Sequence, residues 1–154
     1  HLEKYPDDHL FILGSGHEEE RLRKKVTELQ CEHRIHLTGY RADVFTFYEL
    51  ADYFILTSDI EGFPNVVLEA MAFGVPVLST SVAGIDEIIK EGQNGFILDR
   101  SIEAVRATMM RVRSFAPARY QQLSQQASAA AEAYSITRIV ARYEELFATY
   151  CNKT

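Results

Sequence analysis

Five short apolar runs, each bounded by turn-forming residues, constrain the fold of this chain more than any other feature of its sequence. They span residues 10–13, 35–37, 53–57, 77–79 and 96–98. Segments with helical spacing of apolar residues separate them, and the runs lack the sustained alternation of a strand with one solvated face. Buried strands that alternate with helices are typical of a parallel sheet covered on both faces. The sequence therefore predicts an α/β fold with a doubly wound, Rossmann-like parallel sheet.

Length and composition limit the number of domains and the kinds of partner. The 154 residues, 47% of them hydrophobic, predict a single domain over residues 1–154, with C-terminal helices at about 102–150. A net charge of −6 and the lack of a basic stripe argue against nucleic acid as a partner. Cys31 and Cys151 are far apart and fit no metal-ligand spacing, which favours reduced thiols in a cytoplasmic protein and no metal. No apolar run approaches the length of a membrane span.

The stretch 58–81, SDIEGFPNVVLEAMAFGVPVLSTS, carries the sharpest chemical signal. Pro64 suits the first position of a helix, and Gly74 with Pro76 suits the residues just beyond its end. We therefore expect a short helix at about 64–73. Its apolar residues cover nearly the whole circumference, which indicates packing on both sides.

Two carboxylates accompany this helix. Glu61 precedes it and Glu69 lies eight positions later, on the same helix face as Asn65. The free N–H groups of a first helical turn favour an anion such as phosphate, and a carboxylate can accept two hydrogen bonds from a ribose diol. A phosphate site beside a ribose site predicts nucleotide binding. The alternative is that Glu61 and Glu69 are ordinary solvated residues.

Two loops that follow predicted strands are further candidates for nucleotide contact. Gly14 and Gly16 follow the first strand, although Glu19 occupies the place of the third glycine of a dinucleotide fingerprint. The loop either lies close to a nucleotide or is simply a tight strand-to-helix turn. The second strand leads into a loop that begins at Thr38 and Gly39.

The central stretch resembles a known family. Glu61-Gly62-Phe63-Pro64-Asn65 followed by Glu69-Ala70-Met71-Ala72 is similar to the E-x7-E element of retaining GT-B glycosyltransferases of the GT4 family. The resemblance covers about residues 10–98. It includes residues 12–16 and 37–39 before the element, and residues 74–77, 83–84, 87–88, 92 and 94–97 after it.

The resemblance implies that the chain is the C-terminal, donor-binding half of a GT-B fold and that it serves a hexosyltransferase of polysaccharide biosynthesis. A nucleotide-sugar donor would bind here, and a separate N-terminal domain would hold the acceptor. By the same resemblance Glu69 holds the ribose, and Glu61 is the catalytic residue on the side of the donor sugar or acceptor. The other implied donor contacts are the backbone of Phe63, Asn65 and Val66 and the glycine loops at Gly14, Gly16 and Gly39. Tyr40 and Arg41 are candidates for stacking on the base or for contact with the ribose, and the alternative for Arg41 is an ordinary surface charge. No cofactor or metal is implied.

Two departures from the family pattern shape the expectations. Many relatives have Gly where this chain has Pro64, which removes one N–H donor. The family's Arg and Lys for the diphosphate belong to a strand and loop upstream of this chain. We therefore expect a sheet whose first strand is missing, in a fragment that is inactive alone. A nucleotide-sugar epimerase, a degenerate transferase and a non-catalytic binding module are the alternatives.

The last predicted helix carries an apolar stripe, which we expect to be core. Its members are Ile139, Tyr143, Leu146, Phe147 and Tyr150. Part of this stripe could instead contact the partner domain, as the terminal helix of GT-B enzymes often does.

Overall fold

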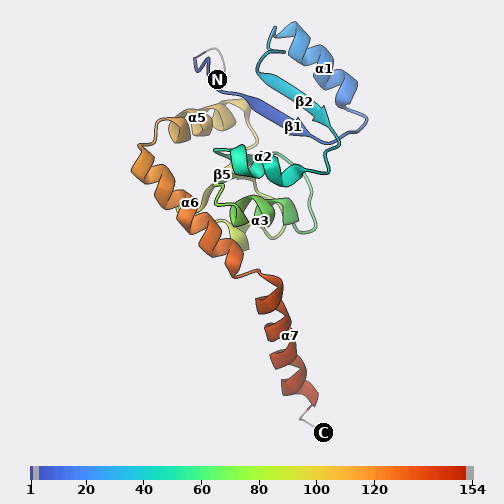
Figure 1. Cartoon of the computed structure of the whole chain (residues 1–154), viewed down its shortest axis with the longest axis vertical. Coiled ribbons are helices and arrows are strands. Elements are labelled where there is room, and N and C mark those ends of the chain that lie inside the picture. Colours follow the sequence, from blue (N-terminus) through green and yellow to red (C-terminus); the bar gives the residue numbers. More distant parts are fainter. Residues whose placement is uncertain (2–3, 152–154) are drawn as a thin grey trace. The chain divides into compact units, whose positions relative to one another are not determined.

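The computed structural model describes His1 and residues 4–151, and it confirms the predicted α/β fold with parallel strands (Figure 1). The chain divides into two compact units, His1–Glu49 and Leu50–Thr154. Each unit has its own parallel sheet, β1-β2 in the first and β3-β4-β5 in the second. The assignment of residues 1–154 to one domain stays a prediction.

The first unit contains β1 (Leu10–Leu13), α1 (Glu19–Glu28), β2 (Ile35–Gly39) and α2 (Val44–Leu50). The two strands pair in parallel from Leu10 with Ile35 to Leu13 with Gly39, and the register shifts between Ile12 and Leu13. Parallel strands need a crossover, which α1 provides. Val26 of α1 is buried, as its place in the helical spacing predicts.

The second unit begins with β3 (Phe54–Leu56), α3 (Asn65–Ala72), β4 (Val77–Thr80), α4 (Ile85–Ile88) and β5 (Gly95–Leu98). It continues with α5 (Ile102–Arg113), α6 (Pro117–Glu132) and α7 (Ile136–Cys151). β4 lies between β3 and β5, and all four of its residues are buried. Because β4 is hydrogen-bonded to a strand on each side, it fixes the start of the loop that follows it.

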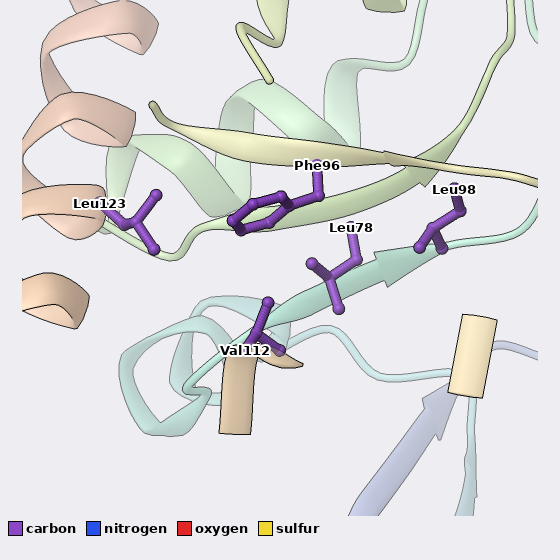
Figure 2. Packing of buried hydrophobic residues seen from close by; sticks show 5 residues of the cluster. All are labelled: Leu78, Phe96, Leu98, Val112 and Leu123. Carbon is purple, nitrogen blue, oxygen red and sulfur yellow. The ribbon is translucent and has the colours of Figure 1, made fainter. Parts of the chain in front are cut away.

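The core of this unit joins its sheet to two of its helices (Figure 2). Leu78 of β4, Phe96 and Leu98 of β5, Val112 of α5 and Leu123 of α6 form the cluster. Leu78, Phe96, Leu98 and Leu123 are each no more than 2% exposed. The alternating helices and strands thus bury their apolar faces on one another as the sequence predicts.

Helix α3 departs from its prediction in two ways. Pro64 is the cap residue with φ −82° and ψ 78°, so the helix begins at Asn65 and not at the proline. Val67, Ala70 and Met71 are completely buried, but Val66 and Phe73 are 39% and 42% exposed. The expectation that α3 is packed on both sides is therefore wrong within this structure, since one face is buried and the other is accessible.

Helix α7 corrects a second expectation. Its apolar stripe was expected to be core, yet the described helix has no buried residue. Tyr143, Phe147 and Tyr150 are 56%, 61% and 66% exposed, and α7 extends onward from the end of α6 in Figure 1. Each helix in the described part of the chain is too short or too polar to span a bilayer.

Candidate functional site

Glu61 is held by its own loop. This loop connects β3 to α3, and within it Ser58 Oγ donates a hydrogen bond of 2.7 Å to Glu61 Oε1. The carbonyl oxygen of Ser58 in turn accepts a 2.7 Å hydrogen bond from Thr80 Oγ1, at the end of β4. The Glu61 side chain is therefore connected to the central strand of the sheet through two hydrogen bonds.

Arg100 fastens the same loop from another direction. It follows β5, and its Nη2 donates to the carbonyl oxygens of Asp59 at 3.0 Å and Ser81 at 3.2 Å. Its Nη1 lies 3.3 Å from Asp59 Oδ1. The guanidinium thus joins the two segments that leave the carboxyl ends of β3 and β4, where open α/β sheets bind their ligands.

Phe63 fixes the other side of the loop. Its ring packs over Gly84, where an added Cβ would lie 2.9 Å from Phe63 Cδ2. Gly84 also has φ +79°, a conformation that favours glycine. The ring centroid of Tyr134 lies 6.1 Å from that of Phe63, and Tyr134 donates to the Glu87 carbonyl at 3.3 Å. Gly84 therefore provides both the turn and the space for the aromatic ring.

The N-terminus of α3 is less open than the sequence predicts. The Asn65 N–H donates to the Phe63 carbonyl at 3.0 Å, and the Val67 N–H donates to the Pro64 carbonyl at 2.9 Å. The Asn65 N–H is therefore engaged by the loop in this structure, and its contact with a donor stays a prediction. The partial positive charge of the helix end remains, and Glu69 lies one turn along, half-buried.

The glycine loops of the first unit come together as expected of neighbouring strand ends. The Gly14 N–H donates to the Gly39 carbonyl at 2.8 Å. A Cβ placed on Gly14, Gly16 or Gly39 would meet nothing within 4 Å. The space on the side-chain side of these three glycines is therefore unfilled, while the Gly14 N–H and the Gly39 carbonyl are bonded to each other.

Arg41 is already paired. Its Nε and Nη2 donate to the two carboxylate oxygens of Asp43 at 2.8 and 2.6 Å, and its Cζ lies 5.6 Å from the Phe47 ring centroid. The hydrogen bond from Arg41 lowers the pKa of Asp43 from its ordinary value. Tyr40, in contrast, is 79% exposed. Of the two, Tyr40 offers an accessible ring, whereas Nε and Nη2 of Arg41 are already engaged by Asp43.

The predicted site residues thus fall into two groups. Glu61, Phe63, Asn65, Val66 and Glu69 lie together on one loop and helix of the second unit, and Gly14, Gly16, Gly39, Tyr40 and Arg41 lie on two adjacent loops of the first. Within the described residues no group of three or more His, Cys, Asp or Glu side chains could hold a metal ion.

Sequence reasoning missed the residues that support Glu61. Ser58 and Glu61 are only three positions apart, so their closeness in sequence is the one signal that could have indicated that pair. Thr80 and Arg100 contact the loop from 22 and 41 positions away, and no local pattern marks them.

Comparison with known proteins places this geometry in a family. A family model described as glycosyl transferases group 1 matches residues 1–129. An uncharacterized glycosyltransferase of Haemophilus influenzae is 33% identical over 144 residues, which cover 92% of this chain and 40% of the relative. The UDP-N-acetylglucosamine–peptide N-acetylglucosaminyltransferase GtfA subunit of Streptococcus gordonii is 30% identical over 148 residues, which cover 92% of this chain and 29% of that protein.

Solved structures agree with the sequence relatives. The crystal structure of a GtfA/B complex matches with a TM-score of 0.85 and 29% identity, over 96% of this chain and 31% of that chain. The chain thus spans well under half the length of each of these proteins.

Proposed function

Because the chain belongs to the glycosyl transferases group 1 family and has the fold of a GT-B glycosyltransferase C-terminal domain, we propose that it is the donor-binding half of a retaining GT4 hexosyltransferase. The observation that carries the proposal is the placement of Glu61 and Glu69 on either side of the α3 N-terminus, inside the matched region. The donor is a nucleotide-sugar, and UDP-sugars are the first to test because a relative is named for UDP-N-acetylglucosamine.

Each site residue has a role in this proposal. Glu69 accepts hydrogen bonds from the ribose hydroxyls, and Glu61 contacts the donor sugar on the acceptor side. The backbone of Phe63, Asn65 and Val66 contacts sugar and diphosphate, and the Asn65 N–H does so after leaving the Phe63 carbonyl. The loops at Gly14, Gly16 and Gly39 approach the nucleotide with their backbone, and Tyr40 and Arg41 contact the base or ribose.

The chemistry follows from the charge that develops on the leaving group. The bond between the anomeric carbon and the β-phosphate oxygen breaks, and a bond to the acceptor oxygen forms on the same face of the sugar as the acceptor loses its proton. The nucleoside diphosphate leaves with additional negative charge. Catalysis is then mainly stabilisation of that charge by the positive end of α3 and by an Arg and a Lys of the parent protein, without metal.

The proposal includes partners that this chain does not contain. Its relatives are more than twice as long, so we infer a parent protein with an N-terminal domain that holds the acceptor. We place this parent protein in the cytoplasm, in the biosynthesis of a polysaccharide. Nucleic acid is not proposed as a partner, because the net charge of the chain is −6.

Calorimetric titration of UDP-, GDP- and ADP-sugars tests the proposal, first on this chain and then on the parent protein. We expect one nucleotide series to bind and the parent protein to transfer the sugar with retention at the anomeric carbon. Glu103→Gln, an exposed carboxylate of α5, serves as a control that leaves affinity unchanged. A parent protein that binds no nucleotide-sugar would refute the proposal. Binding without transfer would favour a non-catalytic module.

A further inference from the structure

We propose that Ser58 is a positioning residue for Glu61, and that Thr80 holds Ser58 in place from β4. The proposal rests on the proposed function, in which Glu61 contacts the donor sugar. It assigns roles to two hydroxyl groups, Ser58 Oγ and Thr80 Oγ1, which both lie outside the E-x7-E element. Ser58 Oγ directs Glu61 Oε1, which leaves Glu61 Oε2 as the oxygen that meets a sugar hydroxyl.

The need for such support comes from the position of Glu61. It lies on a loop between β3 and α3, and a Glu side chain loses rotamer freedom when it is fixed in one geometry. A hydrogen bond to a charged acceptor is among the stronger ones in proteins, so Ser58 Oγ at 2.7 Å favours one orientation of the carboxylate. The orientation is therefore set before any ligand binds.

Ser58 is itself held by β4, the strand that is paired on both sides. Thr80 is 3% exposed at the end of β4, which pairs with β3 on one side and β5 on the other. Its Oγ1 donates to the Ser58 carbonyl at 2.7 Å. The two hydrogen bonds form a continuous path from β4 through Ser58 to the Glu61 carboxylate.

The loop is also fastened on both sides of Glu61. Arg100 binds the Asp59 carbonyl two positions before it, and Phe63 packs on Gly84 two positions after it. With the backbone fixed at these points, the rotamer of Glu61 is what remains to be set. Ser58 sets it.

Ser58→Ala is the direct test, read first by the crystal structure of the variant chain. We expect Glu61 to leave its present rotamer while the backbone of the loop stays in place. Ser58→Thr retains a hydroxyl and should restore the rotamer. A Ser58→Ala structure in which Glu61 keeps its rotamer would overturn the proposal, and this readout needs no ligand.

Affinity for UDP and UDP-glucose gives the second readout. We expect Ser58→Ala to weaken the binding of UDP-glucose about tenfold and to leave the affinity for UDP unchanged, because only the sugar contacts Glu61 in the proposed function. Ser81→Ala removes a neighbouring exposed hydroxyl and should change neither value. If Glu61→Ala weakens the binding of UDP-glucose but Ser58→Ala does not, the positioning role of Ser58 is refuted and the proposed function stands. If Glu61→Ala also has no effect, the role of Glu61 in the proposed function fails.

Thr80 is tested with two variants because it is buried. Thr80→Val keeps the shape and removes the hydroxyl, whereas Thr80→Ser keeps the hydroxyl and removes a methyl group. We expect Thr80→Val to reproduce the Ser58→Ala change in the ratio of UDP-glucose to UDP affinity, and Thr80→Ser to keep the original ratio. If Thr80→Ser changes the ratio and Thr80→Val keeps it, Thr80 acts through packing alone, and its proposed role in holding Ser58 is refuted.

Discussion

In the proposed function, Glu69 has the most specific role among the single side chains of the site. It lies half-buried on α3, one turn from Asn65. Two ribose hydroxyls would lose a charged acceptor in Glu69→Ala, and hydrogen bonds to charged groups are each worth about 1.5–3 kcal/mol. We expect nucleotide-sugar affinity to fall by roughly 3 kcal/mol, or more than a hundredfold, in a calorimetric titration.

The fold of the Glu69→Ala variant must be unchanged for this result to count. Circular dichroism and a urea melt provide that check, and Glu69→Gln shows how much of the loss belongs to the charge. A correctly folded Glu69→Ala protein with full affinity would exclude Glu69 as the ribose ligand.

Gly84 gives a prediction about stability. In Gly84→Ala a residue other than glycine must adopt φ +79°, and its Cβ would lie 2.9 Å from Phe63 Cδ2. The left-handed conformation alone costs about 1–2 kcal/mol, and displacement of the ring adds to it. A urea titration should therefore show a lower free energy of unfolding.

Gly62→Ala is the matched control for Gly84→Ala. Gly62 lies on the same loop as Phe63 but has no positive φ, and its added Cβ would meet nothing within 4 Å. We expect a change within about 0.5 kcal/mol. An equal loss of unfolding free energy in the two variants would mean that the packing of Phe63 on Gly84 does not contribute to stability.

Among the elements, α3 makes a prediction about where a diphosphate binds. Its N-terminus carries partial positive charge, and the Asn65 N–H is 3.0 Å from the carbonyl of Phe63. We expect the diphosphate to lie at this helix end, and the Asn65 N–H to turn from the Phe63 carbonyl to a phosphate oxygen. A crystal structure with bound UDP checks both statements, and a diphosphate bound elsewhere would remove the proposed mechanism.

Strand and helix identities could be predicted because their signals are local. The apolar runs around Leu78 and Phe96 predict buried strands, and both residues are core in the structure. The comparisons also confirm that the resemblance at the E-x7-E element indicated a GT-B glycosyltransferase. Residue spacing and apolar runs carry this information without any knowledge of tertiary contacts.

What could not be predicted depends on contacts between distant residues. Arg100 reaches the loop of Glu61 across 41 positions, and Thr80 reaches Ser58 across 22. The prediction that the apolar stripe of α7 is core was wrong for a related reason. Helical spacing indicates which residues share a face, but it does not say whether this chain supplies the surface that covers that face.

The strand pairing within each sheet leads to a prediction about the stability and activity of these 154 residues. In a doubly wound parallel sheet the inner strands pair with a neighbour on both sides. In the described ladders β1 pairs with β2 alone and β3 with β4 alone.

An unpaired strand edge leaves backbone donors and acceptors without protein partners. We therefore expect the chain extended upstream by one strand and helix of the parent protein to unfold at a higher denaturant concentration than the 154 residues alone. We also expect the shorter chain to show no sugar transfer. If the two unfold at the same midpoint and the shorter one consumes donor, both the proposed upstream strand and the proposed role of an upstream Arg and Lys are refuted.

The exposed face of α7 has a consequence for hydrogen exchange. The helix has 16 residues and no buried side chain, and a peptide helix of about that length is only marginally stable in water by itself. α6 has the same length but buries Leu123, Ala127 and Ala131. We expect the amide hydrogens of α7 to exchange with deuterium far faster than those of α6, as in a segment that opens independently. The exchange rate of α7 would then report directly on any surface that comes to cover its apolar face.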